Sequence, residues 1–351
     1  MKKYANTNTF LVLMAGVLLC SCSAKNLLTL SVTEPAPVHV SSAIKKVGII
    51  DRSLPSDKTA KIDKLDKILS AEGKNLDKDG AKESVTGLSD ELIGMGRFDE
   101  VKIINDRRIR SQGVGVLPAA LSWNEIDRIC KANKVDAIFS LSLYDTDSKI
   151  DYKTAPVEIV GPLGVKVQAL EHHATIATLI KTGWRIYDPG IKNILDEYLI
   201  NDEVVLTGKG INPVKAAEAI MGRREAVLQM SNSIGRNYAK RILTYRTRVS
   251  RYYYVRGTDN FKIAKRRAQT GNWDGAAELW DKEVSNPKPK VAGRACYNMA
   301  IINEINGDLD AAVEWASKSY TDYKDKLALR YIKILNNRIN RNRQLQNQLN
   351  D

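Results

Sequence analysis

The sequence predicts an α/β domain over residues 44–247, followed by an all-α module over residues 248–351. Two observations support this division. Strand-like and helix-like patterns alternate through the first two thirds of the chain, which is typical of a layered α/β domain. In the last third, a helical segment recurs at an offset of 36 residues, which indicates an internal repeat. A chain of 351 residues is long enough to form two such domains.

The start of the chain has the pattern of a lipoprotein signal. Two lysines precede about ten apolar residues (10–19), a run too short to cross a hydrocarbon core of about 30 Å. Cys20-Ser21-Cys22 follows, and a leucine lies three residues before Cys22. We therefore expect a signal peptide over residues 1–21 and acylation of Cys22. Acylation of Cys20 and a secretory signal without lipid are the alternatives.

The residues after the signal predict a spacer and a location. Residues 22–43 are expected to form a linker, because Glu34-Pro35-Ala36-Pro37 favours extended backbone over helix. Neither an aspartate nor an acidic run follows Cys22 directly, so the usual cues for inner-membrane retention and surface export are missing. We expect attachment to the outer membrane on its periplasmic face, with surface exposure left open.

Positive charge is concentrated in the last third of the chain. The formal net charge is +13, and residues 236–351 carry 23 basic against 12 acidic side chains. This excess suggests an acidic partner, either phosphate-bearing lipid or an acidic protein and not nucleic acid, although a long basic helix can also be a solvated face. Cys130 and Cys296 fall in predicted helices of different domains, so we expect neither a disulfide framework nor a cysteine zinc site.

The elements of the α/β domain follow from apolar spacing and capping residues. Ser122 with Glu125 three residues later has the spacing of a capping box, so a helix is expected to start there. Asp188-Pro189-Gly190 predicts a turn between two strands. The predicted helices cover residues 58–70, 81 to about 94, a segment within 118–134 that starts at Ser122, and 213 to about 245. The predicted strands cover 46–50, 98–104, 135–143, 174–187 and 194–205, with an interrupted apolar run over 157–167.

The internal repeat lies in the helical module. Gly271–Trp280 and Gly307–Ala316 match, with glycine at the turn and small residues where two helices would cross. They resemble tetratricopeptide repeats, whose period of about 34 residues implies an insertion near residues 286–289. Because two repeats cannot bury a solenoid core alone, we expect the 213–245 helix and a final helix over 326–349 to cap them.

The order of elements in the first domain resembles the periplasmic domain of the curli-secretion lipoproteins of the CsgG type. The local matches are Val47–Ile50, Gly96–Val101, Asp106–Arg108, Val135–Tyr144 and Tyr187–Gly190. Channel members of that family need two membrane-spanning hairpins per subunit, whereas residues 150–180 could supply only one, so no pore is expected. The whole chain resembles uncharacterised lipoproteins of gut Bacteroidota, which implies an architecture and a location but no chemistry.

Few residue patterns point to catalysis. Adjacent residues of a strand face opposite sides, so His172 and His173 are not expected to share a metal ion. Asp145, Asp147 and Asp151 lack the glycine and terminal glutamate of a calcium-binding loop, which favours a solvated strand edge. We therefore expect no cofactor, no metal and no enzymatic activity.

The candidate binding residues lie in the repeats and at the junction of the two domains. Tyr252-Tyr253-Tyr254 is flanked by arginines, a composition favoured at interfaces, although packing between the domains is the simpler alternative. Asn298 and Asn303 fall on the first helix of the second repeat, which usually faces the ligand in tetratricopeptide proteins. The residues expected to bind a partner are Arg266, Arg267, Asn298, Asn303, Tyr252 and Arg256.

The sequence therefore favours a non-enzymatic protein-interaction scaffold of the cell envelope. It would be tethered to the membrane by lipid and would hold an envelope protein or a peptide segment in the groove of the repeats. The alternative is a ring-forming secretion or assembly component related to curli-type export. An enzyme is the third hypothesis.

Overall fold

A computed structural model describes residues 24–53, 75–106, 109, 115–160, 164, 166–218 and 222–351. The predicted signal peptide, Cys22 and the helix predicted over 58–70 lie outside the described residues. The chain divides into two compact units. The first, here called the sheet unit, spans residues 36–243 with Asp351. The second, here called the helical unit, combines the residues up to 35 with residues 244–350.

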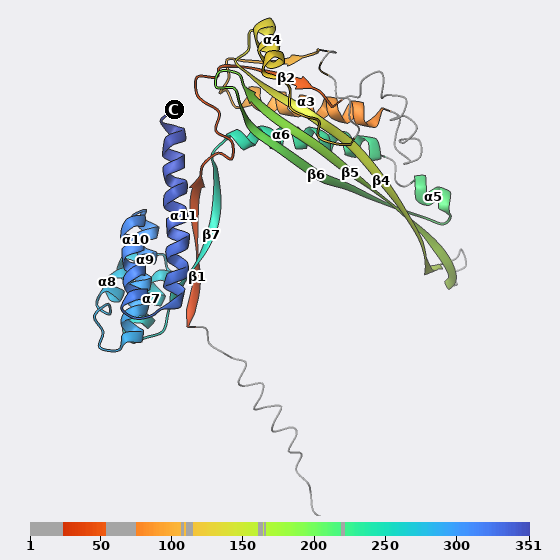
Figure 1. Cartoon of the computed structure of the whole chain (residues 1–351). Coiled ribbons are helices and arrows are strands. Elements are labelled where there is room, and N and C mark those ends of the chain that lie inside the picture. Colours follow the sequence, from red (N-terminus) through yellow and green to blue (C-terminus); the bar gives the residue numbers. More distant parts are fainter. Residues whose placement is uncertain are drawn as a thin grey trace, which may run out of the picture. The chain divides into compact units, whose positions relative to one another are not determined.

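The sheet unit is built on a five-stranded sheet in the order β3-β2-β4-β5-β6 (Figure 1). Strand β2 (Lys46–Asp51) pairs in parallel with β3 (Glu100–Ile104) and β4 (Ala137–Val160), whereas β4, β5 (Lys166–Asp188) and β6 (Asn193–Gly210) form an antiparallel meander. Parallel neighbours require crossover connections, and the alternation of strands and helices in the sequence supplies them. The predicted mixed α/β layer is confirmed.

Helices cover both faces of this sheet (Figure 1). On one face α3 (Leu76–Gly94) and α6 (Arg223–Ala239) enclose a core that contains Phe139. On the other face α4 (Trp123–Asn133) packs on Ile138. The two neighbouring residues of β4 reach opposite cores because successive side chains of a strand alternate between faces.

The helix caps that the sequence predicts are present. The Ser122 hydroxyl accepts a hydrogen bond from the Glu125 backbone N–H at 3.3 Å and starts α4. The Asn212 side chain accepts one from the Lys215 N–H at 2.9 Å and starts α5 (Pro213–Glu218), which has proline at its first position.

The single helix predicted from 213 to about 245 is wrong in its extent and its role. The chain forms α5, then α6 after Gly222 at φ 98°, then a short 3-10 turn over Lys240–Ile242. Glycine adopts this left-handed conformation without a steric penalty, so the helix breaks there. Helix α6 packs on α3 inside the sheet unit, so it does not cap the helical repeats.

Strand β4 is much longer than the sequence predicts. The strand expected to end at Leu143 continues to Val160, and it stays paired with β5 from Ile138↔Tyr187 to Val160↔Lys166. The extension alternates charged and apolar residues on faces that are largely exposed, so it lacks the buried apolar pattern by which the sequence identifies a strand.

The helical unit begins with a two-stranded antiparallel ribbon. Residues 25–34, expected to belong to a linker, form β1 (Lys25–Glu34), which pairs with β7 (Tyr245–Tyr254). Leu28 and Val32 are buried on one side of β1, so the segment has strand periodicity. The module expected to be all-α therefore contains this ribbon, whose two strands are more than 200 residues apart in the sequence.

Five helices follow the ribbon: α7 (Asp259–Gln269), α8 (Trp273–Asp281), α9 (Pro289–Asn306), α10 (Leu309–Thr321) and α11 (Lys326–Leu349). The pairs α7–α8 and α9–α10 share one turn chemistry. Gly271 and Gly307 both have positive φ, and the next residue in each case, Asn272 or Asp308, caps the following helix with its side chain. The predicted final helix is confirmed. Among the described residues, no helix combines the length and apolarity needed to cross a membrane.

Candidate functional site

The ribbon lies on the helix that the sequence assigns to ligand binding. The Asn298 side chain on α9 is fully buried, accepts a hydrogen bond from the Tyr254 N–H at 2.7 Å, and donates one to the Tyr254 carbonyl at 2.8 Å. An asparagine that satisfies both polar groups of one residue binds extended backbone. The backbone it holds is the protein's own strand β7, so Asn298 is not available to a partner, contrary to expectation.

A buried ionic cluster fixes the same ribbon to α9 and α11. The Arg251 guanidinium on β7 donates two hydrogen bonds of 2.8 Å to the Glu304 carboxylate. The Tyr331 hydroxyl and the Arg338 guanidinium donate to the same carboxylate at 2.5 and 2.6 Å. Burial acts to raise the pKa of Glu304, but the hydrogen bonds from its donors outweigh burial, and the pKa lies below its usual value.

The consecutive tyrosines at the end of β7, residues 252–254, have different environments. Tyr253 is buried and packs edge-on against Trp273 with ring centroids 5.4 Å apart. Tyr252 is exposed, and the Lys25 ammonium lies 5.2 Å from its ring centroid. The tyrosine cluster is therefore mainly packing within the helical unit, and only Tyr252 presents a ring to solvent.

Two of the predicted binding residues, Arg256 and Arg266, lie together in a groove of about 820 Å³ within the helical unit. This basic groove is defined by eight residues. They come from the start of strand β1, the β7–α7 connection and one face of α7. They are Asn26, Val255, Arg256, Gly257, Lys262, Lys265, Arg266 and Gln269. Its lining holds four cations and no carboxylate, so its chemistry suits an anion.

The remaining predicted residues do not join this groove. Arg267 donates to the Gly275 carbonyl at 2.6 Å and pairs with Glu278 at 3.3 Å, which ties α7 to α8. Asn303 donates to the Met299 carbonyl of its own helix at 2.8 Å. Both side chains form their polar contacts within the helical unit, and neither lines the groove.

The two groove lysines were missed by sequence reasoning, although a signal was present. Lys262, Lys265, Arg266 and Gln269 follow the spacing i, i+3, i+4, i+7, which places them on one face of a helix. The contribution of Asn26 had no sequence signal, because it depends on the pairing of β1 with β7.

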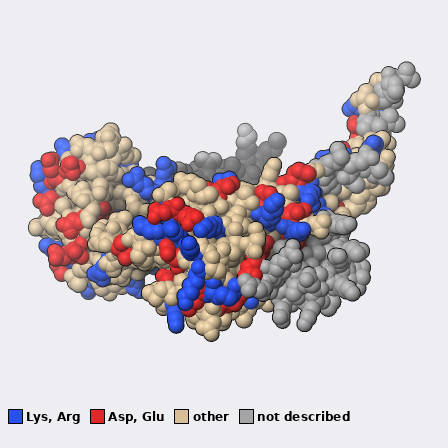
Figure 2. All heavy atoms as spheres, turned by 90° about the horizontal axis from the view of Figure 1, so that it is seen from above, with Lys and Arg blue, Asp and Glu red and all other residues tan. Residues whose placement is uncertain are grey.

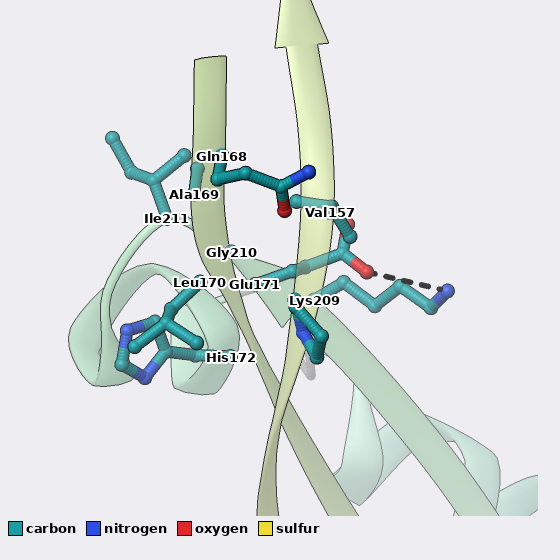
Figure 3. Close-up of a pocket in the computed structure, with 10 residues that line it drawn as sticks. Val157, Gln168, Ala169, Leu170, Glu171, His172, Lys209, Gly210 and Ile211 are labelled. Carbon is teal, nitrogen blue, oxygen red and sulfur yellow. Dashed lines mark ion pairs between the residues drawn. The ribbon is translucent and has the colours of Figure 1, made fainter.

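A second concavity, of about 740 Å³, lies on the extended β4–β5 hairpin of the sheet unit (Figure 3). Val157, Ala169 and Leu170 form its apolar part, and Ile211 closes it from the segment after β6. Lys209 reaches across to Glu171, with Nζ and Oε2 3.6 Å apart (Figure 3). The lining is mostly apolar and the concavity is open to solvent. These properties suit contact with a partner protein better than binding of a small polar ligand.

The histidines of this hairpin have separate partners. The His172 ring lies against Tyr152 with centroids 5.8 Å apart, and His173 pairs with Glu171 at 2.7 Å. Within the described ranges, no three histidine, cysteine, aspartate or glutamate side chains lie together as a metal site would require.

Both described cysteines are free and buried, Cys130 in α4 and Cys296 in α9. Burial raises the pKa of the Cys130 thiol to about 12 and that of the Cys296 thiol to about 11. These thiols are therefore protonated at neutral pH and do not resemble activated nucleophiles.

Many charges of the sheet unit are paired. On the face drawn in Figure 2, basic and acidic side chains lie beside one another over much of the coloured surface. Between α6 and α3, for example, Arg236 pairs with Asp90 at 3.2 Å and Arg224 pairs with Asp79. The lining of the basic groove differs from this pattern because it contains no acid.

Two family models match parts of the chain. The family described as Domain of unknown function (DUF8603) matches residues 44–254, and Domain of unknown function (DUF6340) matches residues 262–337. No curated protein matches the chain.

Two solved structures are distantly similar. The PelC dodecamer from Paraburkholderia phytofirmans has 9% identity, covers 62% of this chain and 97% of its own, and gives a TM-score of 0.25. A neuraminyllactose-binding hemagglutinin homolog from Helicobacter pylori has 11% identity, covers 59% of this chain and 87% of its own, and gives 0.27.

Proposed function

We propose that this protein, which belongs to the family described as Domain of unknown function (DUF8603), is a non-enzymatic scaffold of the cell envelope that holds a partner protein through its β4–β5 hairpin. The sequence placed the partner in the groove of the repeats. Because Asn298 binds the protein's own ribbon, the proposed docking surface moves to the hairpin.

The observation that carries this proposal is the length of the hairpin. Strand β6 accompanies β5 only as far as the pair His172↔Gly210. Beyond it, β4 and β5 continue as a two-stranded ribbon from Ala155↔Glu171 to Val160↔Lys166. A two-stranded ribbon is at best marginally stable in water, so a projecting one is favoured when a partner covers its face.

The side chains of the β4–β5 hairpin suit a protein partner. Leu170 is 58% exposed and Val160 is 69% exposed, and Ile150 and Tyr152 are exposed farther along the same strands. Apolar and aromatic side chains rimmed by ionic pairs such as Lys153–Asp151 have the composition of an interface.

The location and the repeat class belong to the same proposal. The signal pattern supports acylation at Cys22, attachment to the outer membrane on its periplasmic face, and kinship with Bacteroidota lipoproteins. The shared turn chemistry of α7–α8 and α9–α10 supports a tetratricopeptide-like pair of repeats. In this protein, the two repeats would hold the β1–β7 ribbon, and with it the anchored N-terminal segment, instead of a ligand.

Replacing Cys22 by alanine is expected to move most of the protein from the membrane fraction to the soluble fraction. A chain that carries acyl groups at one cysteine depends on that residue for stable attachment. The measurement is fractionation in 0.5 M salt, which screens ionic attraction to lipid, with Cys20→Ala as the matched control. Retention of the Cys22 variant in the membrane at high salt would contradict the anchor.

Site-specific cross-linking in cells tests the hairpin. A photoreactive amino acid at Leu170 or Tyr152 is expected to give one discrete adduct, because these exposed side chains line the proposed surface. The same group at Ile191, which is equally exposed on the β5–β6 turn, is the control and is expected to give none. In the Tyr152 probe, a second change of Leu170 to lysine should reduce the adduct at least fivefold.

Two outcomes would count against the scaffold. Adducts of equal yield at Ile191 and at the hairpin sites would mean that the hairpin has no selective partner. An adduct composed only of copies of this chain, at stoichiometric yield, would favour the ring-forming assembly component instead.

A further inference from the structure

Three of the four cations of the basic groove have no ionic partner among the described residues. The side chains of Arg256, Lys265 and Arg266 form no hydrogen bond or ion pair with any other described residue. Lys262 pairs with Asp259 at 2.8 Å, but that contact is highly exposed at both ends. An array of unpaired cations around one concavity attracts anions strongly at low ionic strength.

The groove is polar and well formed as well as charged. The Asn26 and Gln269 amides lie in its lining, and the backbone of Gly257 adds a polar surface without a side chain. Lysines and arginines with amide donors are the usual partners of phosphate oxygens. The groove therefore suits phosphate groups better than it suits an apolar ligand.

The position of the groove along the chain indicates where its phosphate comes from. Asn26, which lines the groove, is four residues after Cys22. Four residues span at most about 14 Å of extended chain. A lipid on Cys22 would therefore keep the groove within about two Debye lengths of the headgroups, where ionic attraction to the membrane operates.

We propose that the basic groove binds the phosphate headgroups of anionic phospholipid and forms a second membrane contact beside the lipid anchor. This inference rests on the proposed acylation of Cys22, because the anchor brings the groove to the membrane. The combination of acyl chains with a polybasic surface is an effective way to stabilise attachment. It would also orient the helical unit with the Lys25 end of the ribbon toward the lipid.

The test uses the chain from Ser23 to Asp351. This chain carries no acyl group because it lacks Cys22. Its binding to vesicles containing phosphatidylglycerol is measured by sedimentation at 0.05 and 0.5 M salt, with phosphatidylcholine vesicles in parallel. We expect binding to the anionic vesicles only, with a loss of at least tenfold at the higher salt.

A charge-reversal pair locates the binding. Lys265→Glu with Arg266→Glu is expected to weaken binding at least tenfold, since each cation near an anionic surface contributes about fivefold. The matched control is Arg246→Glu with Arg248→Glu, the same change of charge on exposed arginines of β7. Arg246 pairs with Thr33, eight residues of β1 away from Lys25 and hence about 26 Å along the ribbon. The control is expected to change binding less than threefold.

Any of the following outcomes would overturn the inference. Equal binding to both kinds of vesicle, or equal loss in the control pair, would remove the groove from the membrane contact. Binding to polyglutamate that anionic vesicles do not displace would assign the groove to an acidic protein. Binding of inorganic phosphate without vesicle binding would assign it to a free anion. Because the chain tested has no acyl group, these results are independent of Cys22 lipidation and of the hairpin adducts.

Discussion

Replacing Glu304 by glutamine is expected to lower the free energy of unfolding of the helical unit by about 3–5 kcal/mol. The Glu304 carboxylate is fully buried and accepts hydrogen bonds from Arg251, Tyr331 and Arg338. Without its negative charge, the Arg251 guanidinium would remain buried beside a second cation with no counter-ion. Removing one partner of a buried ionic cluster costs more than the intact cluster contributes, because the remaining charge is desolvated without compensation.

The same residue predicts how stability depends on pH. The pKa of Glu304 is lower in the folded protein than its ordinary value of 4.5. Its contribution is therefore fully present above about pH 4.5, where the carboxyl of the unfolded chain is ionised, and it is lost as the pH falls through the lower folded pKa. The Glu304→Gln variant should lose this part of the acid sensitivity.

The measurement is urea denaturation between pH 3 and pH 7, with hydrogen exchange used to assign the transition to the helical unit. Glu314→Gln is the matched control, since Glu314 is exposed on α10, and it should change stability by less than about 0.5 kcal/mol. Equal stabilities of the Glu304 variant and the natural protein at pH 7 would show that the cluster does not support the ribbon.

Replacing Asn298 by leucine is expected to destabilise the docking of the ribbon by about 2–4 kcal/mol. Leucine has the same number and branching of side-chain heavy atoms but cannot bond to the N–H and carbonyl of Tyr254, which Asn298 satisfies at 2.7 and 2.8 Å. Each polar group left unpaired in a buried position costs about 1–3 kcal/mol, and Tyr254 is only half-buried.

Hydrogen exchange of β1 and β7 measures this effect directly. Exchange of their paired amides should accelerate by about thirtyfold or more, which corresponds to about 2 kcal/mol. Asn303→Ala is the control on the same helix, because Asn303 bonds only to the Met299 carbonyl. Unchanged exchange in the Asn298 variant would mean that the ionic cluster and the aromatic contacts hold the ribbon without help from Asn298.

The helices were the most predictable part of the fold. The capping residue Ser122 and the apolar face with Ile126 and Ile129 place α4, and the final helix α11 has the expected bounds. Local hydrogen bonds and the 3.6-residue period act within a few residues, so the sequence reports them directly. The repeated turn at Gly271 and Gly307 was predictable for the same reason.

The strands were predicted less completely than the helices. Strand β2 has a continuous apolar run inside the sheet, and it was identified. The extension of β4 beyond Leu143 was missed because its faces are largely exposed, although its partner β5 is the next strand. The whole of β1 was missed because its partner is distant in the sequence. Strand β1 pairs with β7 more than 200 residues away, and no local pattern encodes that pairing.

The candidate site was also predicted only in part from the sequence. Arg256 and Arg266, both named from the sequence as candidate binding residues, lie in one groove, Arg256 before α7 and Arg266 in its last turn. Asn298 was assigned to ligand binding on its helix position, whereas the structure gives it to the protein's own backbone. A side chain that can bind extended backbone does not itself reveal whether that backbone belongs to a partner.

The sequence by itself determined the signal pattern with its candidate lipidated cysteine, the order of an α/β domain before helices, the repeated helix turns and the basic excess of the last third. Each of these depends on composition or on neighbours within a few residues. Only the tertiary structure decided that the N-terminal segment returns to pair with β7, that this ribbon fills the face of α9, and that the cations of α7 form a groove beside Asn26. These features require contacts between distant segments, which the energetics of packing select after the local elements have formed.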